Sequence, residues 1–192
     1  KSKNKTTKKM TILNIPNLLT LTRIAVTPLI VYLTMQNQLV VVCALIFFSS
    51  FTDWLDGYIA RRFNQYTRLG ELLDPISDRI YILTLLYIVY FIEALNIFFI
   101  ALIILRELIM TIVIAILKTK GVTGLPVHYL GKMGAFNLLI GIPGLIFAKA
   151  FPAQDFIWLT IGWSFLLWGM FLYIFSTIKY LSQARSILKN HG

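Results

Sequence analysis

Two short segments, separated by eight residues, decide the fold and chemistry expected of this chain: Asp53-Trp-Leu-Asp56-Gly57-Tyr-Ile-Ala60-Arg61 and Gly70-Glu-Leu-Leu-Asp74-Pro-Ile-Ser-Asp78. Together they hold five of the chain's eight acidic residues, and long apolar runs flank them on both sides. A carboxylate in such surroundings is costly, at about 2.5–3.5 kcal/mol when it lies at the centre of a bilayer. We therefore expect residues 53–78 to bind something positively charged.

The composition indicates a membrane protein. The 192 residues are 58% hydrophobic, and their mean hydropathy is +0.77, whereas soluble domains are about 45–50% apolar. The net charge of +10 would suggest a nucleic-acid-binding protein if the chain were soluble. Membrane topology explains this charge better, so we expect no nucleic-acid partner. The single cysteine, Cys43, lies in an apolar run, which excludes an internal disulfide.

Apolar blocks of about the 20 residues needed to cross a bilayer predict an all-α integral membrane protein with six transmembrane helices. We place these helices at residues 17–35, 39–61, 71–92, 96–118, 128–149 and 156–182. The expected organisation is a basic cytoplasmic or interfacial segment at 1–16, a catalytic six-helix domain at 17–186 and a cytoplasmic tail at 187–192.

The positions of the basic residues predict the orientation of the helices. Six spans place both termini on one side, and most of the chain's Lys and Arg residues outside the helices fall on that side. On the other side, Lys149 is the only Lys or Arg residue of the predicted turns. Because cytoplasmic connections carry the excess of Lys and Arg, both termini and residues 53–78 are expected at the cytoplasmic face.

The four aspartates have the spacing of a metal site. Asp53 and Asp56 are three residues apart and Asp74 and Asp78 are four apart, so each pair shares a helix face. Because the second and third helices are antiparallel, Asp53 pairs with Asp78 and Asp56 with Asp74. Carboxylate oxygens select hard ions such as Mg²⁺, Mn²⁺ or Ca²⁺. Four carboxylates suit two ions about 3.5–4 Å apart, an arrangement that clamps a phosphoryl group during in-line displacement.

The residues between the aspartates fit the same chemistry. Gly57 and Gly70 leave room for a phosphate or a flat group to approach the backbone. The small side chain of Ala60 leaves the same helix face unobstructed. Arg61 offers a fixed positive charge to a phosphate. The alternative is a set of helix-end charges that pair with neighbouring arginines, namely Arg61, Arg62 and Arg79.

The two segments resemble the signature of the CDP-alcohol phosphatidyltransferases at all eight of its fixed positions, and the six-span layout resembles that family over nearly the whole chain. The resemblance implies a membrane enzyme, typically a homodimer, that transfers a phosphatidyl group from CDP-diacylglycerol to an alcohol and releases CMP. It also implies that two divalent ions, Mg²⁺ or Mn²⁺, are bound by all four aspartates. Asp74 and Asp78 would be catalytic, with Asp78 as the general base. The CDP moiety would be bound by Gly57, Ala60, Arg61 and Gly70.

The acceptor alcohol is less clearly indicated. The segment 17–23, Asn-Leu-Leu-Thr-Leu-Thr-Arg, resembles the branch that makes phosphatidylglycerol phosphate and cardiolipin. In that branch, Arg106 and Lys132 match positions that hold the acceptor's phosphate, with Arg23 as a further cation. Members that use glycerol 3-phosphate commonly carry a second lysine where this chain has Gly134. We therefore favour phosphatidylglycerol, and thus a cardiolipin synthase in a bacterial cell membrane, with glycerol 3-phosphate as the alternative.

Each of these cations also has a simpler interpretation. Arg23 can extend to the membrane interface instead of into a polar cavity. Arg106 can pair with Glu107 or with the aspartates, and Lys132 can be a cytoplasmic anchor. For the whole chain, the rival functions are a divalent-cation or proton transporter and a non-catalytic membrane scaffold. A transporter gives Gly57, Ala60 and Arg61 no role, and helices four to six carry almost no acidic residues that would continue an ion path. A scaffold leaves the four aspartates unexplained.

Overall fold

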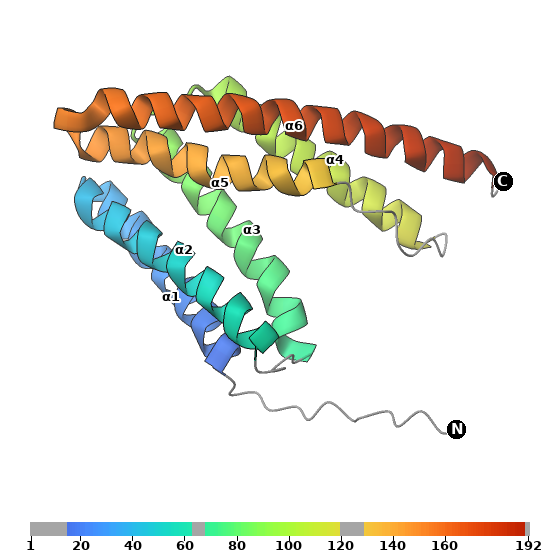
Figure 1. Cartoon of the computed structure of the whole chain (residues 1–192), viewed down its shortest axis with the longest axis horizontal. Coiled ribbons are helices and arrows are strands. Elements are labelled where there is room, and N and C mark those ends of the chain that lie inside the picture. Colours follow the sequence, from blue (N-terminus) through green and yellow to red (C-terminus); the bar gives the residue numbers. More distant parts are fainter. Residues whose placement is uncertain (1–14, 63–67, 120–128, 191–192) are drawn as a thin grey trace. The chain divides into compact units, whose positions relative to one another are not determined.

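The computed structural model describes residues 15–62, 68–119 and 129–190; among these, the side chains at 15–17, 56, 60, 61, 68–75, 118 and 187–190 lie outside the description. The described part is almost entirely helical, which confirms the predicted all-α class, and Figure 1 shows its six long helices. They are α1 (Ile15–Met35), α2 (Leu39–Arg62), α3 (Arg68–Phe91), α4 (Ile97–Thr119), α5 (Tyr129–Ala150) and α6 (Asp155–Asn190), and the short 3₁₀ turn η1 (Pro152–Gln154) joins the last two.

The helix bounds differ from the predicted ones mainly at three ends. α6 continues to Asn190, eight residues beyond the predicted 182, because hydropathy locates the apolar span and says little about where a helix stops. α3 begins at Arg68 instead of 71. α1 begins at Ile15 instead of 17 and so includes Pro16 in its first turn. Proline is tolerated there, since the first N–H groups of a helix have no intrahelical acceptor.

The two predicted short turns between helices are present, and each contains a residue with positive φ. Asn37 (φ 57°) follows α1, and its N–H donates to the carbonyl of Thr34 at 2.9 Å. Glu93 (φ 52°) follows α3, and its N–H donates to the carbonyl of Tyr90 at 3.1 Å. A left-handed residue closes the end of a helix in this way and reverses the chain within a few residues.

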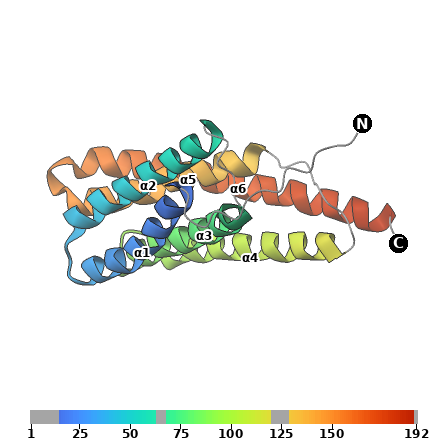
Figure 2. The same ribbon diagram turned by 90° about the horizontal axis from the view of Figure 1, so that it is seen from below.

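The chain divides into two compact units, Lys1–Ile88 and Val89–Gly192. In the first unit, α1 and α2 lie side by side, as Figures 1 and 2 both show. The buried face of α1 follows the helical period, with polar residues in most positions: Thr20, Arg23, Thr27, Ile30 and Thr34. The polar side chains Ser49 and Thr52 are buried near the end of α2, whereas Val42, Cys43 and Ile46 are buried earlier in the same helix.

In the second unit, α5 and α6 form an antiparallel hairpin with very close backbones (Figures 1 and 2). A Cβ added at Gly141 would lie 2.6 Å from the backbone N of Leu166, and one at Gly144 would lie 2.9 Å from the Cα of Gly162. Only glycine permits these approaches, which bring many backbone atoms into van der Waals contact. α4 packs against α6 in the same unit.

Most outward-facing side chains of the helices are large and apolar, including Phe47, Phe98, Phe136 and Phe156. Five helical segments within the described part are long and apolar enough to cross a membrane: Leu18–Met35, Leu39–Ile59, Ile97–Leu117, Tyr129–Ala150 and Pro152–Ser186. α3 has a comparable length of 24 residues, but side-chain description of it begins only at Ile76. The chain is therefore an integral membrane protein built on the predicted helices.

Candidate active site

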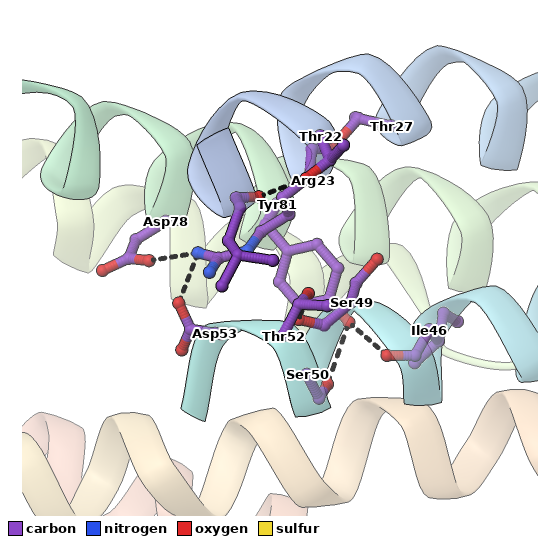
Figure 3. A network of polar contacts seen from close by, with 11 residues as sticks. Thr22, Arg23, Thr27, Ile46, Ser49, Ser50, Thr52, Asp53, Asp78 and Tyr81 are labelled. Atoms are coloured by element: carbon purple, nitrogen blue, oxygen red, sulfur yellow. Dashed lines mark hydrogen bonds and ion pairs between the residues drawn. The ribbon is translucent and has the colours of Figure 1, made fainter. Parts of the chain in front are cut away.

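The first unit brings two of the four aspartates to one buried arginine, as Figure 3 shows. The guanidinium Nη1 of Arg23 on α1 pairs with the Oδ1 of Asp53 on α2 and donates to the Oδ1 of Asp78 on α3, at 3.4 Å in the second case. The Arg23 side chain is only 3% exposed, whereas those of Asp53 and Asp78 are 54% and 59% exposed. The arginine therefore approaches the carboxylates from within the helix bundle and leaves their other side open.

This arrangement favours the polar-cavity interpretation of Arg23, because its side chain is buried among the helices of the first unit. A buried guanidinium needs a negative partner, since an isolated buried charge costs several kcal/mol. Asp53 and Asp78 lie 25 positions apart in sequence but meet at the same nitrogen, as predicted from the antiparallel pairing of their helices.

A hydroxyl cluster supports the helix that carries Asp78. Tyr81 lies one turn further along α3, and its hydroxyl donates to the carbonyl of Ile46 at 3.3 Å and lies 3.2 Å from the hydroxyl of Ser50 (Figure 3). Both of these partners are on α2, less than two turns before Asp53. These hydrogen bonds link α3 to α2 close to Asp53 and Asp78. Sequence reasoning did not identify Tyr81 as part of this site.

The donor set fits a divalent cation. Asp53 and Asp78 supply oxygen ligands only, their Oδ1 atoms already contact a shared positive group, and more than half of each side chain is accessible. No group of three or more Asp, Glu, His or Cys ligands occurs among the described side chains. The predicted partners Asp56 and Asp74 lie in α2 and α3, but their side chains are outside the description.

The same limit applies to most of the predicted CDP pocket. The side chains of Ala60 and Arg61 lie outside the description, and of Gly70 only its place in α3 is described. Gly57 is described and is partly exposed on α2, one turn after Asp53. A partly open glycine beside an accessible carboxylate leaves the backbone free for a ligand to approach.

The second unit holds the other predicted cations. Arg106 lies in the middle of α4, and its side chain is 15% exposed. Its Nη1 donates to the Oε1 of Glu107 at 2.8 Å, which is the ion pair that the sequence left as an alternative role. Its Cζ also lies 3.9 Å from the ring centroid of Tyr173 on α6, in cation–π contact. Lys132, in the first turn of α5, is exposed.

Three helices meet at the guanidinium of Arg106. A Cβ built at Gly131, in the first turn of α5, would lie 3.6 Å from Nη2 of Arg106 and 3.6 Å from Oγ of Ser176 on α6. Nη2 therefore faces the start of α5, where backbone N–H groups lack intrahelical acceptors. The Nε of Arg106 is buried and makes no hydrogen bond within the described part of the chain. A guanidinium next to a helix N-terminus favours an anion.

The sequence analysis did not assign Tyr173 to this site. A signal was nevertheless present, because Tyr173, Ser176, Thr177 and Tyr180 recur at helical spacing within an apolar helix. All four are buried in the structure, so they form a polar face of α6 that is turned into the protein.

Comparison with known proteins identifies the family of the chain. The sequence profile of the CDP-alcohol phosphatidyltransferase family matches residues 13–175. A relative from Streptomyces coelicolor, named cardiolipin synthase (CMP-forming), is 33% identical over 93% of this chain and 86% of its own length. Two further relatives are named CDP-diacylglycerol–glycerol-3-phosphate 3-phosphatidyltransferase. The one from Blochmanniella floridana is 32% identical over 90% of this chain and 95% of its own length. The one from Pseudomonas fluorescens is 30% identical over 94% of this chain and 94% of its own length. The chain thus belongs to the CDP-alcohol phosphatidyltransferase family, whose members make phospholipids.

Proposed function

We propose that this enzyme uses phosphatidylglycerol as its acceptor and is a CMP-forming cardiolipin synthase that depends on Mg²⁺ or Mn²⁺. The observation that carries the catalytic part is the convergence of Asp53 and Asp78 on a single cation, Arg23. Two signature carboxylates from different helices are therefore close enough together to bind one phosphate-bound cation.

In the proposed mechanism, Asp78 is the general base. It takes the proton from the acceptor hydroxyl, whose oxygen then forms a bond to the lipid-bearing phosphorus of CDP-diacylglycerol. The bond between that phosphorus and the CMP oxygen breaks, and CMP leaves with the electron pair. Gly57, Ala60, Arg61 and Gly70 line the CDP pocket and hold the nucleotide in line with the acceptor.

Two divalent ions held by Asp53, Asp56, Asp74 and Asp78 would neutralise the phosphate charges during this displacement. Arg23 keeps Asp53 and Asp78 directed toward the same point. This placement makes Arg23 a positioning group for the carboxylates, in addition to the acceptor-binding role that the resemblance implies for it.

Arg106 and Lys132 are proposed to hold the acceptor's phosphate. Glu107 lies 2.8 Å from Arg106 and partly neutralises it. The remaining positive charge suits the single negative charge of phosphatidylglycerol better than the dianion of glycerol 3-phosphate. The similarity to the Streptomyces cardiolipin synthase supports the same choice, while the similarity to glycerol-3-phosphate transferases keeps that acceptor as the second candidate.

The positive-inside distribution of Lys and Arg supports the placement of both termini and the active site on the cytoplasmic side. The bacterial origin of the relatives supports a bacterial cell membrane. A cytoplasmic site gives CMP a route into water while the acyl chains stay in the bilayer. The homodimer remains a prediction from the family resemblance.

The acceptor is tested by CMP release from CDP-diacylglycerol, with purified enzyme in detergent containing Mg²⁺ or Mn²⁺. Phosphatidylglycerol should support release and glycerol 3-phosphate should not. Asp78→Asn preserves side-chain size but removes the base, so it should reduce release by roughly 10²–10⁴-fold.

Release with glycerol 3-phosphate alone would replace the cardiolipin assignment by the second candidate. Release that persists in Asp78→Asn would exclude Asp78 as the base. If CMP release failed with both acceptors while ions crossed vesicle membranes without CDP-lipid, the transporter alternative would gain support.

A further inference from the structure

Tyr173 covers one face of the Arg106 guanidinium. The 3.9 Å separation between Cζ and the ring centroid is close contact, and both side chains are largely shielded from solvent. A cation–π contact is worth most in such desolvated surroundings. Tyr173 therefore restrains the guanidinium through its ring.

Gly134 is what allows Tyr173 to lie in this position. A Cβ at residue 134 would be 2.5 Å from Cδ2 and 3.2 Å from Cε2 of the Tyr173 ring, and 3.2 Å from the carbonyl oxygen of Gly169. The first distance is too short for any real contact, so a larger residue at 134 must displace the ring. The backbone of α6 blocks part of the space into which the new side chain would go, so the ring has to move.

We propose that Tyr173 is a positioning residue for Arg106 and that Gly134 determines the position of Tyr173, so that the Gly134–Tyr173 contact sets the affinity for the acceptor's phosphate. The proposal rests on the proposed role of Arg106 in binding that phosphate. It adds Gly134 on α5 and Tyr173 on α6 to the acceptor site. It also accounts for the absence of a lysine at 134, because the Tyr173 ring fills the space that the start of such a side chain needs.

The first experiment measures KM for phosphatidylglycerol, as a surface mole fraction in mixed micelles, together with kcat and KM for CDP-diacylglycerol. Tyr173→Leu removes the aromatic face and should raise the acceptor KM about tenfold, with KM for CDP-diacylglycerol unchanged. Tyr173→Phe keeps the ring and should restore most of the acceptor affinity. Equal acceptor KM values in Tyr173→Leu and the wild type would overturn the proposal.

The second experiment moves the ring without changing it. Gly134→Ala should raise the acceptor KM to a similar extent. Gly141→Ala is its matched control, because the added Cβ meets the Leu166 backbone at 2.6 Å on the same helix pair but away from Arg106. It should lower thermal stability and leave the acceptor KM unchanged. The same rise in KM for both alanine variants would mean that general strain between α5 and α6 is responsible, and would overturn the proposal.

A double variant separates positioning from packing. Gly134→Ala with Tyr173→Leu relieves the clash but still lacks the ring. We expect its thermal stability to recover relative to Gly134→Ala, with the acceptor KM still raised. Recovery of both quantities would show that Tyr173 affects the acceptor only through packing, contrary to the proposal.

Arg106→Ala distinguishes failure of this inference from failure of the proposed function. If it raises the acceptor KM while Tyr173→Leu does not, Arg106 binds the acceptor without help from Tyr173, and only the inference fails. If Arg106→Ala leaves the acceptor KM unchanged while CMP is still released, the proposed role of Arg106 fails, and the inference fails with it.

Discussion

Arg23 and Asp78 are 55 positions apart in sequence, yet the Nη1 of the arginine lies 3.4 Å from the Oδ1 of the aspartate. The arginine is buried and the aspartate is more than half exposed, so the pair connects the interior of the first unit to the accessible face of its carboxylates. Asp53 contacts the same nitrogen. One cation from the chain thus separates two carboxylates that would otherwise repel each other.

Removal of this cation should make the protein's stability depend on divalent ions. In Arg23→Ala, the repulsion between Asp53 and Asp78 is no longer offset, and we expect a loss of about 1–2 kcal/mol in metal-free buffer, moderated by the exposure of the carboxylates. Mg²⁺ should recover more stability in the variant than in the wild type. Cys43 is buried and is the chain's single cysteine, so a thiol-reactive fluorogenic dye can follow thermal unfolding.

Arg79→Ala is the matched control for this experiment, since it removes an exposed cation from the residue next to Asp78. It should change stability little, with or without Mg²⁺. An equal Mg²⁺ effect in Arg23→Ala and the wild type would contradict the interpretation of Arg23 as the group that offsets the two carboxylates.

CMP release should stop when a chelator removes divalent ions and should return when Mg²⁺ or Mn²⁺ is added. Asp53→Asn replaces a charged oxygen ligand by a neutral amide of similar size, so the Mg²⁺ concentration for half-maximal release should increase by about 10–100-fold, the range seen when a metal site is impaired. Glu93→Gln changes an exposed carboxylate in the turn after α3 and should have no such effect. Undiminished release in the presence of the chelator would contradict a metal-dependent reaction.

The close contact between α5 and α6 should tolerate no added methyl group. Gly144→Ala would place a Cβ 2.9 Å from the Cα of Gly162, and the backbone shift required should cost about 1–3 kcal/mol of stability. Gly131→Ala is a control on the same helix, because its Cβ would make only ordinary contacts at 3.6 Å or more. Thermal unfolding followed through Cys43 should separate the two variants, and similar midpoints would argue against the close helix contact.

The predicted orientation can be tested at the two ends of α6. Gln154 in η1 and Ser186 near the end of the apolar span are both exposed. In a Cys43→Ser background, a membrane-impermeant thiol reagent added to intact spheroplasts should label Gln154→Cys and not Ser186→Cys. After permeabilisation, both should be labelled. Labelling of Ser186→Cys alone in intact spheroplasts would contradict the prediction and indicate the opposite orientation.

The helices and part of the site could be predicted from sequence because the responsible signals are local. Hydropathy identified all six helices, and the spacing of Asp53 and Asp78 on antiparallel helices predicted that they meet. The end of α6 was misplaced because five of the residues 183–190 are polar, which ends the apolar run, while most of the eight still favour helix; hydropathy does not register helix propensity.

The partners of the two arginines could not be predicted in the same way. Arg23 had two acceptable environments, and only the packing of α1 on α2 decides between them. Tyr173 is 67 positions from Arg106, so no sequence period links them. The spacing of the polar residues of α6 is consistent with a buried face, but the identity of the group that this face contacts depends on tertiary structure.

The contact between Gly134 and Tyr173 has a consequence for the evolution of acceptor choice. If position 134 changes first, the larger side chain collides with the Tyr173 ring. If position 173 changes first, the smaller residue no longer covers the Arg106 guanidinium. Under the proposed role of Arg106, either single step passes through an impaired enzyme. A lineage that changes its acceptor at this pocket is therefore expected to change both positions nearly together, and the two residues should vary as a pair among its descendants.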